Sequence, residues 1–202
     1  MPPVRMRRRQ LLCAALQGAV ITAATTLVRP ASAVAIGGTL PALDAAAPDF
    51  RLPGVAPAPS SNGGPSRAVP TELALGDFAG SWLVLYFYPR DFTGGCTLEA
   101  RGFQRDLQAF RRAGAEVVGV SADDPDSHAS FCSEEGLAFP LLSDPGGQVS
   151  RRYGSWIAPF SQRHTFLIDP DGVIRARWTA VRPSGHSGEV LEELQRLQAQ
   201  AA

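Results

Sequence analysis

The chemistry of this sequence centres on one cysteine, Cys96, which follows a threonine and two glycines. Apolar residues then recur at helical spacing, at Phe103, Leu107 and Phe110, and predict a helix with Cys96 in its first turn. At a helix start, free backbone N–H groups and the positive end of the helix dipole favour the thiolate over the thiol. Because the thiolate is the reactive form, the placement indicates a nucleophile, with an inert buried cysteine as the alternative.

A buried strand must position this cysteine. Residues 83–88, LVLYFY, are a continuous apolar, aromatic and β-branched run that Pro89 ends, which is typical of a central strand. At its other end the predicted helix stops at Gly114, just past two arginines that complement its C-terminal dipole. Cys96 is therefore expected directly beyond the end of a core strand.

Pro89, Thr93 and Cys96 spell P-x-x-x-T-x-x-C within YFYPRDFTGGCTLEA. This pattern resembles the active-site signature of the peroxiredoxins. The surrounding residues look most like those of the peroxiredoxin Q branch, also called bacterioferritin-comigratory proteins. The resemblance covers residues 47–202. It departs at Gly94, where the branch usually has proline.

The resemblance implies an α/β, thioredoxin-like fold with a central mixed β-sheet flanked by α-helices, and a thiol-dependent peroxidase of hydrogen peroxide and organic hydroperoxides. Cys96 would attack the peroxide and become a sulfenic acid. Thr93 would hydrogen-bond the thiolate and orient the peroxide, Pro89 would shield the sulfur from water, and Arg163 matches a family arginine that flanks it. Taken alone, Thr93 would be an N-cap and Arg163 a surface arginine.

A second thiol, Cys132, lies 36 residues beyond Cys96. Many members of the branch carry a nearer cysteine where this chain has Arg101, whereas a subgroup resembles the Cys132 arrangement, which implies a resolving role for Cys132. Two alternatives remain open, a packed cysteine beside Phe131 in a one-cysteine enzyme and a static structural disulfide. Since a disulfide needs Cα atoms about 4.4–6.8 Å apart, we expect both helices to unravel locally before the cysteines join.

The rest of the sequence alternates between strands and helices, which predicts a sheet with helices on both faces. Further strands are predicted at residues 49–52, 72–75, 116–120, 139–142, 165–168 and 173–178. Further helices are predicted at residues 124–135, 147–153 and 189–197. Residues 53–70 are rich in proline, glycine and serine and predict a loop, with the first strand stopped by Pro53 and Gly54.

The N-terminal segment of the sequence predicts export. Residues 1–33 combine a twin-arginine pattern, an apolar run and an A-x-A cleavage site, as a twin-arginine-type signal peptide does. Residues 34–46 then read as a flexible mature N-terminus before the domain at 47–202. We expect the periplasm or the thylakoid lumen as destination, with no stable membrane association after cleavage. An uncleaved membrane anchor is the alternative.

Composition and spacing argue against several other classes. Loss of the predicted signal leaves 14 basic residues against 19 acidic ones, a net charge of about −5, which argues against nucleic-acid binding. His128, His164 and His186 share no metal-ligand spacing, and no dinucleotide or phosphate loop is present, so we expect neither metal nor cofactor. The expected partners are hydroperoxides and a thioredoxin-like reductant, and the expected state is a monomer. The alternatives are an exported thiol–disulfide exchange protein, although C-x-x-C is absent, and a non-catalytic thioredoxin-like binding module.

Overall fold

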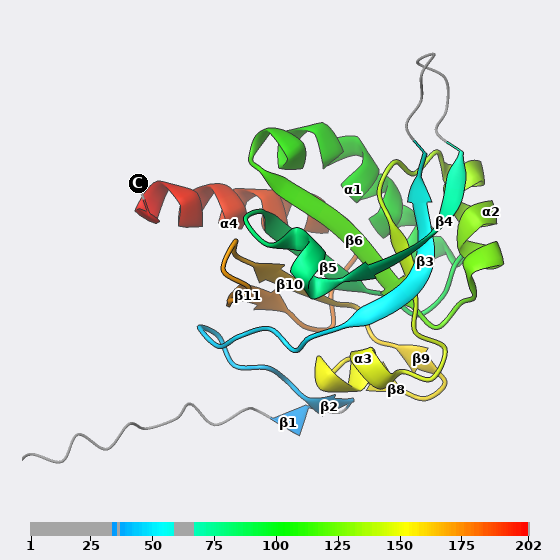
Figure 1. Cartoon of the computed structure of the whole chain (residues 1–202), viewed down its shortest axis with the longest axis horizontal. Coiled ribbons are helices and arrows are strands. Elements are labelled where there is room, and N and C mark those ends of the chain that lie inside the picture. The colour runs from blue at the N-terminus through cyan, green and yellow to red at the C-terminus, as the bar shows by residue number, and fades with distance from the viewer. Residues whose placement is uncertain (1–33, 36, 59–66, 202) are drawn as a thin grey trace, which may run out of the picture.

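The apolar run that contains residues 83–87 forms strand β5 (Trp82–Phe87), the third strand of a seven-stranded sheet (Figure 1). The computed structural model describes residues 34–35, 37–58 and 67–201. The strand order is β11-β10-β5-β6-β7-β3-β4; β5, β6 and β7 are parallel, and the other neighbours are antiparallel. The expected mixed sheet flanked by helices is confirmed.

The element bounds are as follows. The other strands of the sheet are β3 (Arg51–Pro57), β4 (Ala68–Ala74), β6 (Ala115–Ser121), β7 (Leu141–Ser143), β10 (His164–Ile168) and β11 (Ile174–Trp178). The helices are α1 (Gly94–Arg112), α2 (Pro125–Glu135), α3 (Gln148–Arg152), α4 (His186–Ala201) and the 3-10 turn η1 (Leu75–Phe78). Two small ribbons pair β1 (Val34–Ala35) with β2 (Gly38–Thr39), and β8 (Trp156–Ile157) with β9 (Phe160–Ser161).

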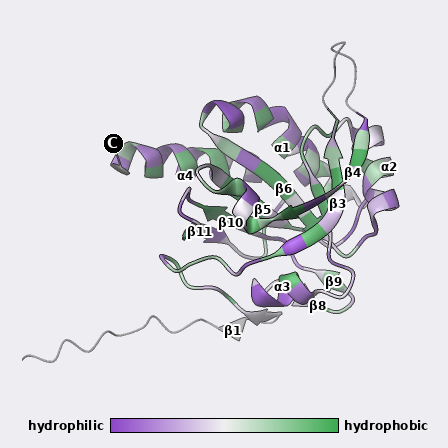
Figure 2. Ribbon diagram, viewed as in Figure 1, coloured by the Kyte–Doolittle hydropathy of each residue, from purple (hydrophilic) through white to green (hydrophobic). Residues whose placement is uncertain are grey.

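Strand β5 is apolar throughout because both faces of the sheet are covered. Val84 and Tyr86 belong to a core cluster shared with α1, α2 and α4. Leu83, Leu85 and Phe87 alternate with them and belong to a second cluster, which includes residues of α3 and of the segment before β3. Figure 2 shows this apolar colouring along the central strands, with hydrophilic residues on the helices around them.

The local signals at the helix ends were read correctly. Asp124 caps α2 by accepting a hydrogen bond from the Ser127 N–H at 2.8 Å, and Gly136 ends the helix with a left-handed φ of 64°. Gly114 likewise follows the end of α1 with φ of 66°. Near the other edge of the sheet, the strands predicted at residues 165–168 and 173–178 correspond to β10 and β11, which form an antiparallel hairpin.

The predicted loop at residues 53–70 is wrong at both of its ends, and its residues 59–66 lie outside the described residues. Strand β3 continues through Pro53 and Gly54 to Pro57, and β4 begins at Ala68, so the two form a long hairpin. Gly54 serves close approach rather than a turn, because a side chain there would run into the Leu141 carbonyl of β7. Proline is tolerated in β4 because β4 is an edge strand.

The prediction that residues 34–46 are flexible is also wrong for residues 40–46. Leu40 is buried, and the Asp44 N–H donates to the Ile174 carbonyl at 2.8 Å. The Asp44 carboxylate pairs with Arg175 at 2.8 Å, and Ala46 bridges to Val173. This segment is therefore attached to β11, more than a hundred residues away in sequence.

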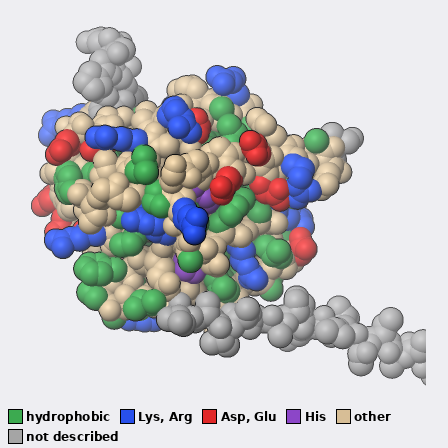
Figure 3. All heavy atoms as spheres, turned by 180° about the vertical axis from the view of Figure 1, so that it is seen from behind, with side chains coloured by type: hydrophobic (Ala, Val, Ile, Leu, Met, Phe, Trp, Pro, Cys, Tyr) green, Lys and Arg blue, Asp and Glu red, His purple; other side chains and the backbone are tan. Residues whose placement is uncertain are grey.

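The predicted signal peptide, residues 1–33, lies outside the described residues. Within the described part of the chain, none of the helices combines the length and the apolar character that a membrane span requires. Figure 3 shows the molecule from behind, where arginines and acidic side chains are interspersed over that face.

Candidate active site

Cys96 lies in the first turn of α1, just beyond the end of β5, as expected. A short loop links Phe87 to Thr93, and Cys96 is the third residue of the helix. Its side chain is 1% exposed and forms no disulfide. The first turn of a helix leaves backbone N–H groups without intrahelical acceptors, so the sulfur lies next to partial positive charge.

Thr93 is directed at the sulfur rather than at the helix backbone. It occupies the N-cap position, yet its hydroxyl makes no capping hydrogen bond. Instead, Oγ1 lies 2.8 Å from Cys96 Sγ and 3.1 Å from the Arg90 carbonyl. A hydroxyl that donates to sulfur stabilises the thiolate, so the capping-only alternative is wrong.

Arg163 completes the surroundings of the sulfur from the other side. It precedes β10, and its Nη1 lies 3.2 Å from Cys96 Sγ and 3.0 Å from Glu99 Oε2. Burial works against its charge, but Cys96 and Glu99 together raise the pKa of the guanidinium. A permanently charged group therefore bridges the thiol and a carboxylate, and the surface-arginine alternative is wrong.

Glu99 is 1% exposed and lies one turn after Cys96. Burial raises its pKa to about 7, against the lowering effect of Arg163. Within the described residues, its Oε1 is buried without a hydrogen-bond partner. The structure therefore places a buried carboxyl with a pKa of about 7 on the same guanidinium as the reactive sulfur.

Gly95 makes the contact with Arg163 possible, a feature that sequence reasoning missed. A Cβ at this position would lie 2.7 Å from Arg163 Nη2. At Gly94, by contrast, a Cβ would meet nothing within 4 Å. The two adjacent glycines thus have different roles, and only the position of Arg163 in the folded protein distinguishes them.

Pro89 ends the strand that leads to this loop and is half-buried. Having no N–H, it removes a donor at the point where β5 leaves the sheet. Its predicted shielding of the sulfur stays a prediction.

Cys132 lies on α2, 5% exposed, in the same apolar cluster as Cys96. Both thiols are free. Burial, with a further contribution from Asp91, raises the pKa of Cys132 to about 12. In this conformation Cys132 is therefore a protonated, packed thiol, and the predicted unravelling of the two helices stays a prediction.

Arg101 forms an ion pair between the two helices that carry the cysteines. Its Nε lies 2.5 Å from Glu135 Oε2, and its Nη2 lies 3.2 Å from Oε1. Glu135 is the last residue of α2, so the pair joins the Cys96 helix to the Cys132 helix.

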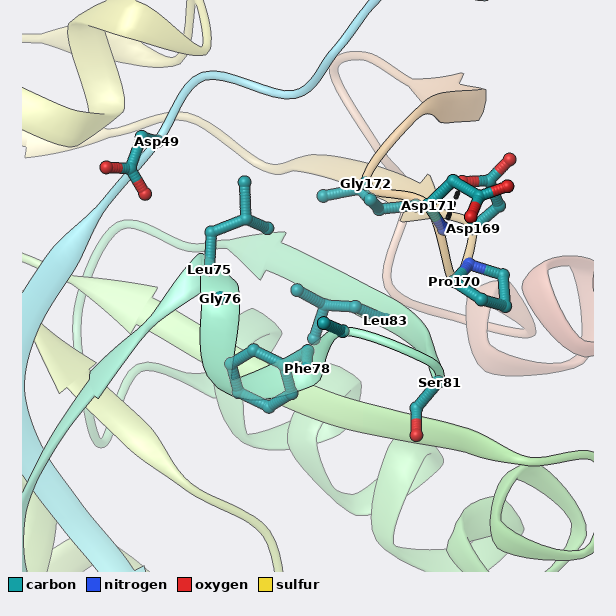
Figure 4. Close-up of a pocket in the computed structure, with 12 residues that line it drawn as sticks. Asp49, Leu75, Gly76, Phe78, Ser81, Leu83, Asp169, Pro170, Asp171 and Gly172 are labelled. Atoms are coloured by element: carbon teal, nitrogen blue, oxygen red, sulfur yellow. Dashed lines mark hydrogen bonds between the residues drawn. The ribbon is translucent and has the colours of Figure 1, made fainter.

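A different cavity, of about 350 Å³, opens at the opposite end of β5 (Figure 4). Leu75, Phe78 and Leu83 form its apolar wall, and no cysteine or arginine lines it. Its Asp169 carboxylate accepts hydrogen bonds from the β10–β11 turn and from Arg175. The cavity thus lacks the groups found around Cys96. Among the described residues, no three His, Cys, Asp or Glu side chains gather as metal ligands would.

Comparisons with known proteins agree with this geometry. A family model for the AhpC/TSA family matches residues 43–177. Peroxiredoxin Bcp of Xanthomonas campestris pv. campestris is 41% identical over 133 residues, which cover 61% of this chain and 82% of that protein. The putative peroxiredoxin bcp of Coxiella burnetii is 39% identical over 142 residues, with coverages of 64% and 94%.

A solved structure of Xanthomonas campestris peroxiredoxin Q superposes with a TM-score of 0.61 at 39% identity, covering 62% of this chain and 85% of that one. The fold and the thiol site together define a thiol-dependent peroxidase of the peroxiredoxin class. The chain belongs to the AhpC/TSA family, and relatives that are 39–41% identical to it carry the names Bcp and peroxiredoxin Q.

Proposed function

We propose that this peroxidase uses Cys96 as the peroxidatic thiolate against hydrogen peroxide and organic hydroperoxides. The observation that carries the proposal is the pair of groups on the sulfur, Thr93 at 2.8 Å and Arg163 at 3.2 Å. A bacterioferritin comigratory protein of Xanthomonas campestris has been captured as a trapped intermediate in alkyl peroxide reduction, which supports organic hydroperoxides as substrates here.

In the first step the thiolate attacks one peroxide oxygen and the O–O bond breaks. Cys96 becomes a sulfenic acid, and the second oxygen leaves with the bonding electron pair and takes up a proton, as water or an alcohol. Charge develops on both oxygens in the transition state, so the Arg163 guanidinium and the Thr93 hydroxyl lower the barrier where they lie. Pro89 keeps bulk water from the sulfur.

In the second step Cys132 resolves the intermediate. Its thiol attacks the sulfenic sulfur, a disulfide forms and water leaves. Serine variants of the Xanthomonas campestris protein have been solved at two cysteine positions, and those positions lie 36 residues apart, as Cys96 and Cys132 do. Because Cys132 is packed and protonated in the reduced fold, α2 has to loosen first.

A thioredoxin-like dithiol then reduces the disulfide, the protein works as a monomer, and no metal or cofactor takes part. We further propose that residues 1–33 direct export to the periplasm or the thylakoid lumen. Replacing Arg8 and Arg9 by lysine should leave an uncleaved precursor in the cytosol; processing that continues unchanged would contradict the export route.

Intact-mass analysis after one equivalent of hydrogen peroxide tests both cysteine roles. The wild type should lose two hydrogen atoms, as an intramolecular disulfide does. The Cys132→Ser variant should instead gain one oxygen atom, trapped by a sulfenic-acid reagent. If Cys96 of either protein stays unmodified by peroxide, the peroxidatic role is lost; if the wild type also stops at sulfenic acid, the resolving role is lost.

A further inference from the structure

A short strap, residues 179–185, joins β11 to α4 and passes beside Arg163. Arg163 lies one residue before β10, outside the register that pairs β10 with β5. Its carbonyl accepts a hydrogen bond from the Val181 N–H of the strap at 3.0 Å. The strap therefore holds the backbone of the residue whose guanidinium contacts Cys96.

The strap also reaches the start of α1. A Cβ on Gly95 would lie 2.7 Å from Arg163 Nη2 and 3.6 Å from Pro183 Cγ, so the guanidinium and the proline ring lie against the same glycine. Ala180, next to Val181, has a φ of 51°, in the left-handed region that alanine rarely adopts. Because such a conformation persists only where the surrounding structure holds it, the strap needs an anchor.

His186, the first residue of α4, anchors the end of the strap. Its side chain is 1% exposed, and its Nε2 lies 2.8 Å from Oγ1 of Thr165, two residues after Arg163. The His186 ring packs edge-on against Trp178, the last residue of β11, and against Phe103 of α1. The centroid distances are 5.7 Å and 5.8 Å.

These contacts join His186 to each of the segments that surround the Arg163 guanidinium, namely β10, the end of β11 that enters the strap, and α1. The next residue, Ser187, donates a hydrogen bond to Asp106 Oδ2 of α1 at 2.6 Å and fixes the same corner. Loss of the imidazole would leave the buried Thr165 hydroxyl without this partner, at the strand end next to Arg163.

We propose that His186 is a positioning residue for peroxide reduction: through Thr165 and the strap, it fixes Arg163 where the guanidinium reaches the Cys96 sulfur. Its action is indirect, since it holds the strand and the strap on either side of the arginine. A displacement of about 1 Å at a reacting group can cost about 100-fold in rate, so small movements of this anchor matter. This inference rests on the proposed peroxidase role of Cys96.

Two substitutions of His186, made in the Cys132→Ser background, test the anchor. His186→Leu keeps an apolar side chain and removes the partner of Thr165, whereas His186→Gln retains an amide for it. In His186→Leu, stopped-flow oxidation of Cys96 by hydrogen peroxide should slow about fivefold, as loss of one ordinary hydrogen bond allows. Alkylation by iodoacetamide should change less than about twofold, because no O–O bond breaks in that reaction. His186→Gln should oxidise within about twofold of the unmodified background.

Two further variants separate the anchor from a general loss of stability. Thr165→Val removes the other partner of the same contact and should slow oxidation as His186→Leu does, which provides the test if His186→Leu does not fold. Leu194→Ala is the matched control, because Leu194 is buried in the same helix about two turns later. Leu194→Ala should be oxidised at the unmodified rate.

A double-mutant cycle with Arg163→Met shows whether His186 acts through the arginine. In the Arg163→Met background, His186→Leu should cause no further loss of peroxide rate. Similar losses with and without Arg163, an unchanged rate in both His186→Leu and Thr165→Val, or an equal loss in Leu194→Ala overturns the positioning role. If Cys96 with His186 intact does not react with peroxide, the proposed function itself is wrong and this inference falls with it.

Discussion

At the scale of single residues, the site depends on one guanidinium shared between a sulfur and a carboxylate. Arg163 lies within hydrogen-bond distance of both Cys96 and Glu99, and the hydroxyl of Thr93, the N-cap residue of α1, contacts the same sulfur. None of these groups has to travel to the thiol during the reaction. In the proposed reaction they contribute preorganised charge, so no rearrangement is needed when the O–O bond breaks.

The two glycines before Cys96 allow a direct test of the Arg163 contact. Gly95→Ala should displace the end of the Arg163 side chain and lower the rate of Cys96 oxidation by peroxide about 10–100-fold, a loss somewhat smaller than that for removing a catalytic donor outright. Gly94→Ala, with open space around its Cβ, should react at the wild-type rate. Stopped-flow oxidation of both variants checks this; equal rates would show that Arg163 does not need the space.

Glu99 should give folding a characteristic pH dependence. Its pKa is raised from 4.5 to about 7 in the folded state, so folding takes up a proton between those values. The stabilisation from protonated Glu99 is complete below pH 4.5 and is lost as the pH rises to 7, by about 3 kcal/mol at most. Urea unfolding across this range should show the unfolding free energy of the wild type declining relative to that of Glu99→Gln as the pH rises. Parallel curves for the two proteins would contradict the buried carboxyl.

At the scale of elements, the functional unit is the junction of β5, α1 and α2. Strand β5 leads into the loop, and Cys96 lies at the start of α1. Helix α2 contacts that loop through hydrogen bonds and carries Cys132. Arg101, in the first half of α1, adds an ion pair to Glu135 at the end of α2. In the proposed cycle, resolution by Cys132 breaks contacts of α2, so the stability of this junction would set how quickly a disulfide forms.

Gly94 offers a way to strengthen this junction. It is the first residue of α1, its neighbour Thr93 has an extended ψ of 140°, and space around it is open, so proline fits. Gly94→Pro should stabilise the reduced protein by about 0.4–1 kcal/mol. Disulfide formation should slow by the factor to which that free energy corresponds. Thermal unfolding and quenched-flow mass analysis measure the two effects. Faster disulfide formation in this variant would contradict local unravelling at the start of α1.

At the scale of the whole molecule, acid should loosen the fold through buried histidines. Burial lowers the pKa of both His164 and His186, and Glu189 partly opposes the effect at His186. The unfolded chain binds protons below about pH 6.5 that the folded chain refuses. Stability contributed by these groups is therefore present above that pH and lost below it.

His186→Gln should reduce this acid sensitivity. The Nε2 atom of His186 lies 2.8 Å from Thr165 Oγ1, a partner that a glutamine amide can retain. Because glutamine does not titrate, we expect the unfolding free energy of the variant to rise relative to that of the wild type as the pH is lowered from 7 to 5, measured by urea titration. A variant that loses unfolding free energy relative to the wild type over this range would contradict the neutral buried histidine.

Local signals predicted much of this molecule. The apolar run of β5, the helical spacing after Cys96 and the cap at Asp124 are each short-range patterns, and each gave the right element. They also placed Cys96 and Thr93. Arg163 was found only through the family resemblance, because its partners lie more than sixty residues away.

Long-range contacts account for what the sequence did not reveal. Pro53 and Gly54 carry turn signals, yet pairing of β3 with β4 and β7 overrides them. The segment around Asp44 has no periodic pattern and is fixed by β11. The contacts of Asp91 with α2 and the need for glycine at Gly95 depend on side chains that only the folded chain brings together.

The most direct test compares two reactions of Cys96 in the Cys132→Ser background. Oxidation by hydrogen peroxide needs Thr93 and Arg163 to act on the breaking O–O bond, whereas alkylation by iodoacetamide needs only a thiolate. In Arg163→Met, peroxide oxidation should fall about 100–1000-fold, as for loss of one preorganised donor, while alkylation should fall far less. Arg105→Met, a surface change on α1, should alter neither rate. Equal losses in both reactions, or a peroxide rate no faster than that of free cysteine, would contradict the account.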